Sequence, residues 1–168
     1  MDALKKIKVV AMDVDGVLTD GRIIMDSHGV ESKNFDVQDG LGIFLLKKCG
    51  LRTAIISARE SGVVAHRAKD LKIDKVWVGV YPKISAYEIM LKEFAVSDEE
   101  VCFIGDDLAD LCIMNRCGVG IAVANAVFEV KRIADHVTVR SGGHGAVREA
   151  VEWILKAQGH WSPELYEQ

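Results

Sequence analysis

The sequence predicts an α/β fold, a doubly wound, Rossmann-like parallel sheet with helices on both faces. Two observations favour this class. Short apolar runs alternate with segments of helical spacing along nearly the whole chain. Polar clusters directly follow several of these runs, at the carboxyl ends of the predicted strands, where such sheets bind ligands. The length of 168 residues suits a single domain spanning 1–168.

The first part of the chain contains one apolar strand and an inserted hairpin. Residues 7–12 form a continuous apolar run, typical of a strand that is buried on both faces. Residues 22–35 hold two short segments around a turn at 27–29, which predicts a β-hairpin. Ile23 and Met25 share one face of that hairpin. We expect this face to be buried against another subunit, because a lone hairpin is only marginally stable.

The rest of the chain alternates between helix and strand. A loop at 36–40 leads into the next helix, and Ser61 is a suitable N-cap for a later one. Further strands are expected at 52–57, 75–79, 101–105, 120–124 and 136–139. Helices are expected at 41–49, 61–71, 82–94, 108–117, 126–133 and 146–158.

Composition excludes several classes of protein. The net charge of −4 argues against a nucleic-acid surface, which is normally basic. No apolar run is long enough to span a membrane, and no signal peptide is visible at the amino terminus. The four cysteines show no CxxC spacing, so we expect reduced thiols and a cytoplasmic location.

Two carboxylates stand two residues apart at the end of the first strand. Asp13 and Asp15 are followed by Gly16, which allows the chain to turn sharply. On an extended backbone, positions i and i+2 point to the same side. Two adjacent carboxylates repel unless a cation or a shared proton intervenes, and Mg²⁺ favours carboxylate oxygens. The alternative is a simple acidic turn, because Asp and Gly are common turn residues.

Other polar residues are expected to meet this acidic pair. The carboxyl ends of parallel strands lie at one edge of a sheet, so residues far apart in sequence can share one crevice. A phosphate group would suit the set, with Ser57 bonding a phosphate oxygen and Lys83 balancing charge. Asp15 could protonate a leaving alcohol and later activate water. The converging residues are Asp13, Asp15, Ser57, Arg59, Lys83, Asp106 and Asp110.

These motifs, in this order, resemble the four motifs of the haloacid dehalogenase superfamily of phosphatases. Segments 15–21, 39–42, 105–110 and 145–149 are more closely similar to the 3-deoxy-D-manno-octulosonate 8-phosphate phosphatases. That family is a small, capless branch that includes phosphatases of related nonulosonate 9-phosphates. The resemblance covers nearly the full chain and implies a Mg²⁺-dependent phosphatase of a sugar-acid phosphate. It also implies a covalent aspartyl-phosphate intermediate.

The resemblance implies a role for each residue of the motifs. Asp13 would be the nucleophile and a metal ligand, and Asp15 the acid/base whose backbone carbonyl also binds the metal. Asp106 would be the third protein ligand. Ser57 and Lys83 would hold the phosphate. Two acids, Asp107 and Asp110, would support the metal site from nearby. The sugar acid would contact Asp15, Asp36, Val37, Gln38, Asp39, Gly40, Arg59, Arg67 and Lys83. The family is typically a homotetramer in which the hairpins pair and neighbouring subunits close each other's sites.

Two departures from the family pattern keep other substrates open. Gln38 and Phe44 stand where relatives usually carry Arg, the natural partner of a substrate carboxylate. A nonulosonate 9-phosphate, such as 2-keto-3-deoxynononate 9-phosphate, or a broader range of sugar phosphates is the alternative. Two of the assigned residues also have simpler interpretations, Arg67 as a solvated helix residue and Asp107 as a helix cap.

Two non-enzymatic functions remain as alternatives. A receiver-type signalling domain also uses Mg²⁺, acids, a hydroxyl and a lysine on a parallel sheet. Its phospho-accepting aspartate ends the third strand, however, where this chain has Gly79. A catalytically idle assembly domain is the other alternative, although all four motifs are intact.

Overall fold

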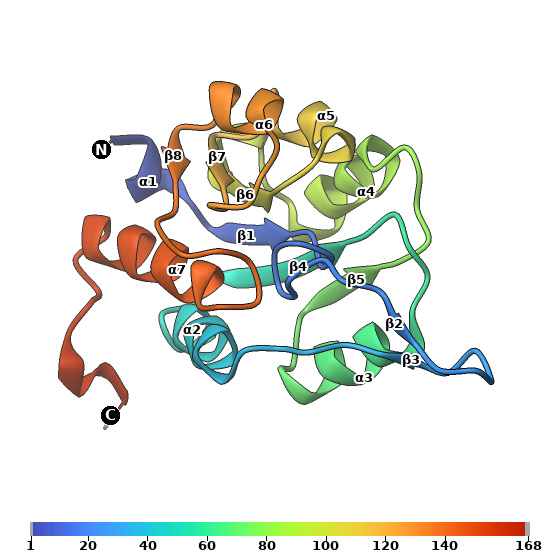
Figure 1. Ribbon diagram of the computed structural model, residues 1–168. Coiled ribbons are helices and arrows are strands. Elements are labelled where there is room, and N and C mark those ends of the chain that lie inside the picture. The colour runs from blue at the N-terminus through green and yellow to red at the C-terminus, as the bar shows by residue number, and fades with distance from the viewer. Residues whose placement is uncertain (1, 167–168) are drawn as a thin grey trace.

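A computed structural model describes residues 2–166 and confirms the predicted parallel sheet (Figure 1). Six strands pair in the order β5-β4-β1-β6-β7-β8, and every pairing is parallel. The strands are β1 (Val9–Met12), β4 (Arg52–Ile56), β5 (Lys75–Trp77), β6 (Val101–Gly105), β7 (Val119–Ala122) and β8 (His136–Val137).

Helices cover both faces of the sheet, as a doubly wound fold requires. Figure 1 shows α4 (Ile84–Phe94), α5 (Leu111–Met114) and α6 (Phe128–Ile133) above the sheet. Below it lie α2 (Val37–Lys48), α3 (Gly62–Asp70) and α7 (Ala146–Ala157). The sequence did not predict α1 (Asp2–Lys6) or the short 3₁₀ turns at Asp98–Glu100 and Pro163–Tyr166. Within the described residues, no helix combines the length and apolar character needed to cross a membrane.

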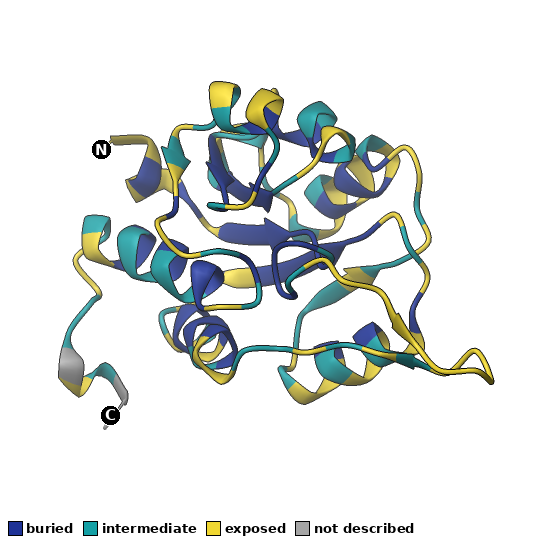
Figure 2. Ribbon diagram, viewed as in Figure 1, coloured by how far each residue is buried: buried dark blue, intermediate teal, exposed yellow. Residues whose placement is uncertain are grey.

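The central strands are the most deeply buried part of the molecule (Figure 2). Every residue of β1 and β6 is buried, as expected for strands covered on both faces. Their register pairs Met12 with Ile104, and the amide of Asp13 donates to the Ile104 carbonyl at 3.0 Å. The two strands therefore end at the same level, which places the residues after each of them side by side.

The predicted loop at 36–40 is wrong, because α2 already begins at Val37. Asp36 caps this helix, and its Oδ1 accepts a hydrogen bond from the Gln38 amide at 2.6 Å. Gly40 suggested a loop but instead permits close packing: a Cβ there would lie 2.8 Å from Nη2 of Arg67. Gly40 therefore reflects the close approach of Arg67 from α3 and does not break α2.

The predicted helix at 108–117 is shorter than expected. It consists of a 3₁₀ turn at Leu108–Asp110 followed by the four residues of α5. The Asp110 side chain folds back to accept from the Asp106 and Asp107 amides, at 2.9 and 3.3 Å. These bonds satisfy the two backbone amides of the tight turn that begins the segment.

The segment between β1 and α2 contains a short antiparallel pairing of β2 (Ile24–Met25) with β3 (Glu31–Ser32). Figure 2 shows most of it exposed. In the single chain, the side chains of Ile23 and Met25 are 60% and 57% exposed. Their predicted burial against another subunit stays a prediction.

Candidate active site

Four loops at the carboxyl edge of the sheet bring most of the predicted residues together. Asp13 follows β1, Ser57 follows β4, Lys83 precedes α4 and Asp106 follows β6. A cavity of about 160 Å³ opens between them. Its lining residues are Asp13, Asp15, Ser57, Ala58, Arg59, Lys83, Asp106, Asp107 and Ala109. A larger cavity, of about 430 Å³, lies at the opposite edge of the sheet beside Lys8 and Leu51, and contains none of these residues.

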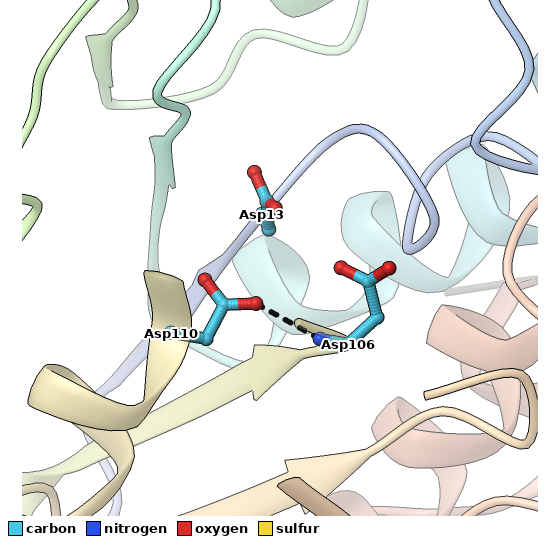
Figure 3. A group of neighbouring side chains, drawn as sticks. All are labelled: Asp13, Asp106 and Asp110. Atoms are coloured by element: carbon cyan, nitrogen blue, oxygen red, sulfur yellow. Dashed lines mark hydrogen bonds between the residues drawn. The ribbon is translucent and has the colours of Figure 1, made fainter. Parts of the chain in front are cut away.

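Three carboxylates, drawn in Figure 3, form the centre of this site together with one lysine. Asp13, Asp106 and Asp110 each offer an oxygen within 4.8 Å of the others. Lys83 is only 1% exposed, and its Nζ lies 2.9 Å from Asp13 Oδ2 and 2.7 Å from Asp110 Oδ1. The Val14 amide donates to Asp13 Oδ1 at 2.7 Å and fixes the other side of that carboxylate.

Asp110 holds this centre in place. One of its oxygens binds Lys83, and the other accepts from the amides of Asp106 and Asp107. Gly105 makes the approach possible, because a Cβ there would lie 2.7 Å from Cβ of Asp110. Asp107 accepts a hydrogen bond from the Leu108 amide at 2.7 Å, which is the capping interaction considered as an alternative for it, and it also lines the cavity.

The excess of negative charge shifts the pKa values of this centre. Burial, followed by the charge of Asp110, raises the pKa of Asp13 to about 6 although Lys83 opposes the shift. Burial and the charges of Asp13, Asp110 and Asp107 raise the pKa of Asp106 to about 8. Burial would lower the pKa of Lys83, but Asp13 and Asp110 raise it above its ordinary value. One ammonium group does not neutralise three carboxylates.

This donor set fits a divalent cation. Among residues 2–166, Asp106 Oδ1 is buried without a hydrogen-bond partner, which is costly for a carboxylate unless a cation satisfies it. Gly16 lies against the other oxygen: its φ is +92°, and a Cβ there would lie 2.0 Å from Asp106 Oδ2. The Asp15 side chain is not one of the three clustered carboxylates. The predicted binding of a metal by its backbone carbonyl stays a prediction.

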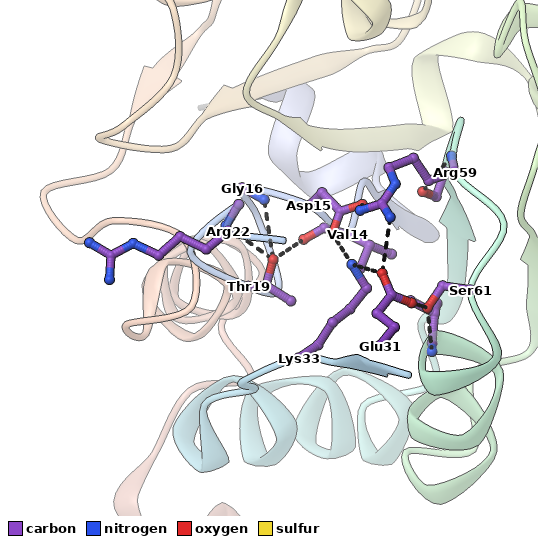
Figure 4. A network of polar contacts seen from close by, with 12 residues as sticks. Val14, Asp15, Gly16, Thr19, Arg22, Glu31, Lys33, Arg59 and Ser61 are labelled. Carbon is purple, nitrogen blue, oxygen red and sulfur yellow. Dashed lines mark hydrogen bonds and ion pairs between the residues drawn. The ribbon is translucent and has the colours of Figure 1, made fainter. Parts of the chain in front are cut away.

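Asp15 lies in a second network of charges (Figure 4). Lys33, from the segment after β3, donates to Asp15 Oδ1, and Nη1 of Arg59 lies 3.6 Å from Asp15 Oδ2. Glu31 binds both cations, with Lys33 Nζ at 3.2 Å and Arg59 Nη2 at 3.1 Å. The hydroxyl of Ser61 also donates to Glu31 and is the main cause of a lowered Glu31 pKa, followed by Lys33.

The sequence analysis missed Glu31 and Lys33. A signal was present, because the two charged residues alternate with Ser32 and Asn34 and therefore share one face of the hairpin strand. Charged residues on an edge strand are usually interpreted as solvated. Here the Lys33 side chain is 0% exposed, and that burial could be seen only in the structure.

The residues predicted to contact a sugar at the start of α2 lie outside the described lining of the 160 Å³ cavity. Val37 is exposed, and the Gln38 side chain accepts from Arg140 Nη1 at 2.6 Å. Asp39 is buried, accepts from the Arg148 amide at 2.8 Å, and has a pKa raised to about 6 mainly by burial. The Asp39 carboxylate therefore holds α7 against α2.

Arg67 also has partners of its own. Its Nη1 lies 2.6 Å from Asp70, and its guanidinium stands 5.6 Å from the centroid of the Phe35 ring. The substrate contacts predicted for Arg67 and for residues 36–40 stay predictions.

Comparisons with known proteins agree with this geometry. A profile of haloacid dehalogenase-like hydrolases matches residues 80–149. The chain is 42% identical over 156 residues to the 3-deoxy-D-manno-octulosonate 8-phosphate phosphatase KdsC of Haemophilus influenzae, covering 93% of this chain and 87% of that protein. The chain belongs to the 3-deoxy-D-manno-octulosonate 8-phosphate phosphatase family. This membership confirms the resemblance indicated by the motifs.

Solved structures of this family share the fold. The phosphatase from Moraxella catarrhalis, in complex with a magnesium ion, a phosphate ion and a KDO molecule, has a TM-score of 0.92 and 44% identity, covering 94% of this chain and 91% of that one. The cobalt-bound phosphatase from Haemophilus influenzae has a TM-score of 0.94 and 39% identity, with 99% of each chain covered.

Proposed function

We propose that this chain is a single-domain, Mg²⁺-dependent phosphatase that releases phosphate from 3-deoxy-D-manno-octulosonate 8-phosphate. One observation carries the proposal: Asp13, Asp106, Ser57 and Lys83 line one cavity in a chain that belongs to this phosphatase family. The related structure from Moraxella catarrhalis, which contains magnesium, phosphate and KDO, supports the metal and the class of substrate.

Asp13 is the proposed nucleophile. One of its oxygens attacks phosphorus, and the bond between phosphorus and the sugar oxygen breaks. Asp15, in its protonated form, gives its proton to the leaving oxygen. In the second step Asp15 takes a proton from water as the water oxygen attacks the phosphorus of the aspartyl phosphate. Inorganic phosphate leaves, and the Asp13 carboxylate is regenerated.

The metal would be held by the side chains of Asp13 and Asp106, with the backbone carbonyl of Asp15. When bound, Mg²⁺ reduces the repulsion between the carboxylate nucleophile and the phosphate anion. Asp110 and Asp107 would support the site from behind, since Asp110 fixes the loop that carries Asp106.

Ser57 and Lys83 are the proposed phosphate-binding groups. Lys83 already bridges Asp13 and Asp110, so its charge lies where phosphoryl transfer takes place. The Ser57 hydroxyl lines the cavity and accepts from the Arg59 amide at 3.3 Å, which leaves its proton available to donate to a phosphate oxygen.

A second substrate is a nonulosonate 9-phosphate, such as 2-keto-3-deoxynononate 9-phosphate, or a broader set of sugar phosphates. The feature that favours it is the presence of Gln38 and Phe44 at two positions where the resemblance to the family implies arginine. The sugar acid would contact Arg59, Arg67 and residues 36–40. A receiver-like signalling role is less well supported, because Asp13 ends the first strand of the sheet.

We further propose a cytoplasmic homotetramer assembled through the hairpin at 22–35. The support is the row of apolar side chains that this hairpin exposes in the single chain, Ile23, Ile24, Met25 and Val30. The free cysteines of the described chain are compatible with a reducing compartment.

A phosphate-release assay tests the proposed function. The purified chain would be given octulosonate 8-phosphate, nonulosonate 9-phosphate and simple sugar phosphates, each with Mg²⁺ or with EDTA. We expect Mg²⁺-dependent release with a clear preference for one sugar-acid phosphate. Release from no ester would refute the phosphatase, and undiminished release in EDTA would refute the role of the metal. Sedimentation of the same sample tests the tetramer, which a monomer at micromolar concentration would contradict.

A further inference from the structure

The most unusual buried charge outside the phosphatase motifs is Lys33. The hairpin that carries it is largely exposed, yet the Lys33 side chain is 0% exposed. Burying an ammonium group is costly unless it is paired, and here it contacts two carboxylates, Asp15 and Glu31. The hairpin strand therefore directs one charged side chain into the site, and Figure 4 shows it meeting Asp15 there.

The contacts of Asp15 are divided between its two oxygens. Lys33 donates to Oδ1, and Arg59 approaches Oδ2 at 3.6 Å. The torsion that turns a carboxylate group is soft, so an unsupported aspartate does not keep one oxygen facing one direction. The hydrogen bond from Lys33 on one side and the charge of the Arg59 guanidinium on the other favour one direction. Lys33 is the closer partner and donates to Oδ1, whereas Oδ2 has only the more distant Arg59 guanidinium beside it.

Glu31 contacts both cations, Lys33 and Arg59, and Ser61 in turn holds Glu31. Glu31 contacts Lys33 and Arg59 together, and Ser61, the N-cap of α3, donates to Glu31. Two acids, Asp15 and Glu31, thus face two cations, Lys33 and Arg59, so the group is balanced in charge. This balance distinguishes it from the acid-rich centre around Lys83 and indicates a fixed arrangement that needs no added ion.

We propose that Lys33 is a positioning residue for the acid/base Asp15, and that Glu31 fixes Lys33 for this task. The inference rests on the proposed function, because it assigns a role within that reaction. Lys33 does not transfer a proton itself. It holds the Asp15 carboxylate so that one oxygen meets the leaving oxygen of the substrate and, later, the attacking water.

The role predicts a selective kinetic defect in Lys33→Met. With the sugar-acid phosphate, whose alkoxide leaving group needs a proton, we expect the single-turnover rate of phosphoryl transfer to fall roughly 10- to 100-fold. The KM should change less than about threefold, because substrate binding is retained. With 4-nitrophenyl phosphate, whose leaving group needs little protonation, the same step should slow less than about threefold.

Two control variants accompany this measurement. Lys33→Arg keeps a charged donor and should recover part of the lost rate. Lys75→Met removes a half-buried lysine that pairs with Glu93 at 2.6 Å, far from the site, and it should leave both rates unchanged. Equal slowing of both substrates in Lys33→Met, an effect confined to KM, or no effect would overturn the proposal.

A second variant decides the matter if Lys33→Met does not fold. Glu31→Gln removes the charge that pairs with Lys33 and Arg59 and leaves Asp15 unchanged, so it should give a smaller defect with the same selectivity for the sugar-acid phosphate. Unselective slowing or wild-type rates in Glu31→Gln would then overturn the proposal. Failure of the proposed function looks different, since the wild-type chain itself would release no phosphate.

Discussion

The two lysines of the site, Lys83 and Lys33, both have buried side chains and each bridges two carboxylates, yet they are carried by different elements. Lys83 meets Asp13 and Asp110 beside β1 and β6, which are central strands of a six-stranded sheet. Lys33 follows a two-residue strand in a hairpin that is mostly exposed. The group around Lys83, Asp13, Asp106 and Asp110, here called the sheet half, is built into the core. The group around Lys33, Asp15, Glu31 and Arg59, the hairpin half, depends on an element that is only marginally stable alone.

Similar ion pairs have different roles in these two parts of the site. Around Lys83 the acids outnumber the cations, and the pKa values of Asp13 and Asp106 are raised accordingly. Around Lys33 the charges balance. We therefore expect the sheet half to respond to metal and pH, and the hairpin half to affect the geometry of proton transfer.

Replacing the nucleophile should give the largest effect. Asp13→Asn removes a charge with little change in volume, so we expect turnover to fall by roughly 10⁴-fold or more while the fold persists. Phosphate release and thermal unfolding would be measured together. Substantial remaining activity would contradict the assignment of Asp13.

A matched control for this variant is Asp74→Asn, at the opposite edge of the sheet. Asp74 binds the Thr53 amide at 2.8 Å and Lys47 at 3.1 Å. Loss of the Asp74 charge should lower the free energy of unfolding and leave the turnover of folded protein near the wild-type value. A large loss of turnover in Asp74→Asn would show that damage to the fold alone can cause the loss of activity expected from removing the nucleophile.

Removing the central cation should mainly destabilise the sheet half. Lys83→Met leaves Asp13 and Asp110 buried without their shared partner, which we expect to cost about 3–5 kcal/mol of unfolding free energy. Denaturant titration in EDTA measures this cost. Mg²⁺ should restore part of it, because the metal also neutralises Asp13, and wild-type stability of the variant in EDTA would contradict the account.

Stability should also depend jointly on pH and Mg²⁺. Because the folded-state pKa values of Asp13 and Asp106 are raised to about 6 and about 8, ionising them costs stability as pH rises from about 4 to about 8. Mg²⁺ binds the ionised form, so the rise in Tm that it causes should be larger at pH 8 than at pH 5. A rise that is equal at both pH values would argue against these residues as ligands.

The smallest effect on the single chain is expected at the outer face of the hairpin. Met25→Ser changes an exposed side chain, so the stability of the chain itself should change by less than about 0.5 kcal/mol. The proposed tetramer should weaken, which sedimentation over a range of concentrations would detect. An unchanged assembly would show that this face of the hairpin is not the contact surface.

The sheet half of the site was predictable from sequence, because its residues lie next to recognisable strands. Asp13, Ser57 and Asp106 each follow an apolar run, and parallel strands bring such positions to one edge. The central role of Asp110 was less visible, since it depends on a side chain folding back onto backbone amides.

The hairpin half was not predictable for a physical reason. The alternation of Glu31 and Lys33 indicates that they share a face, but burial of Lys33 depends on residues far away in sequence, Asp15 and Arg59. The start of α2 was missed for a related reason. Gly40 resembles a loop residue, but it is required because Arg67 lies against the helix there.

The most direct test of the account is to identify the residue that carries the phosphoryl group. An Asp15→Asn variant, in which hydrolysis of the acyl phosphate should be slow, would be mixed with Mg²⁺ and 4-nitrophenyl phosphate, whose leaving group needs little protonation by Asp15. The mixture would then be quenched and reduced with borohydride. Reduction converts aspartyl phosphate to homoserine, which peptide mass spectrometry locates. We expect homoserine at position 13 only when the ester and the metal are both present. Homoserine at another aspartate, or at none, would contradict the role of Asp13 as nucleophile.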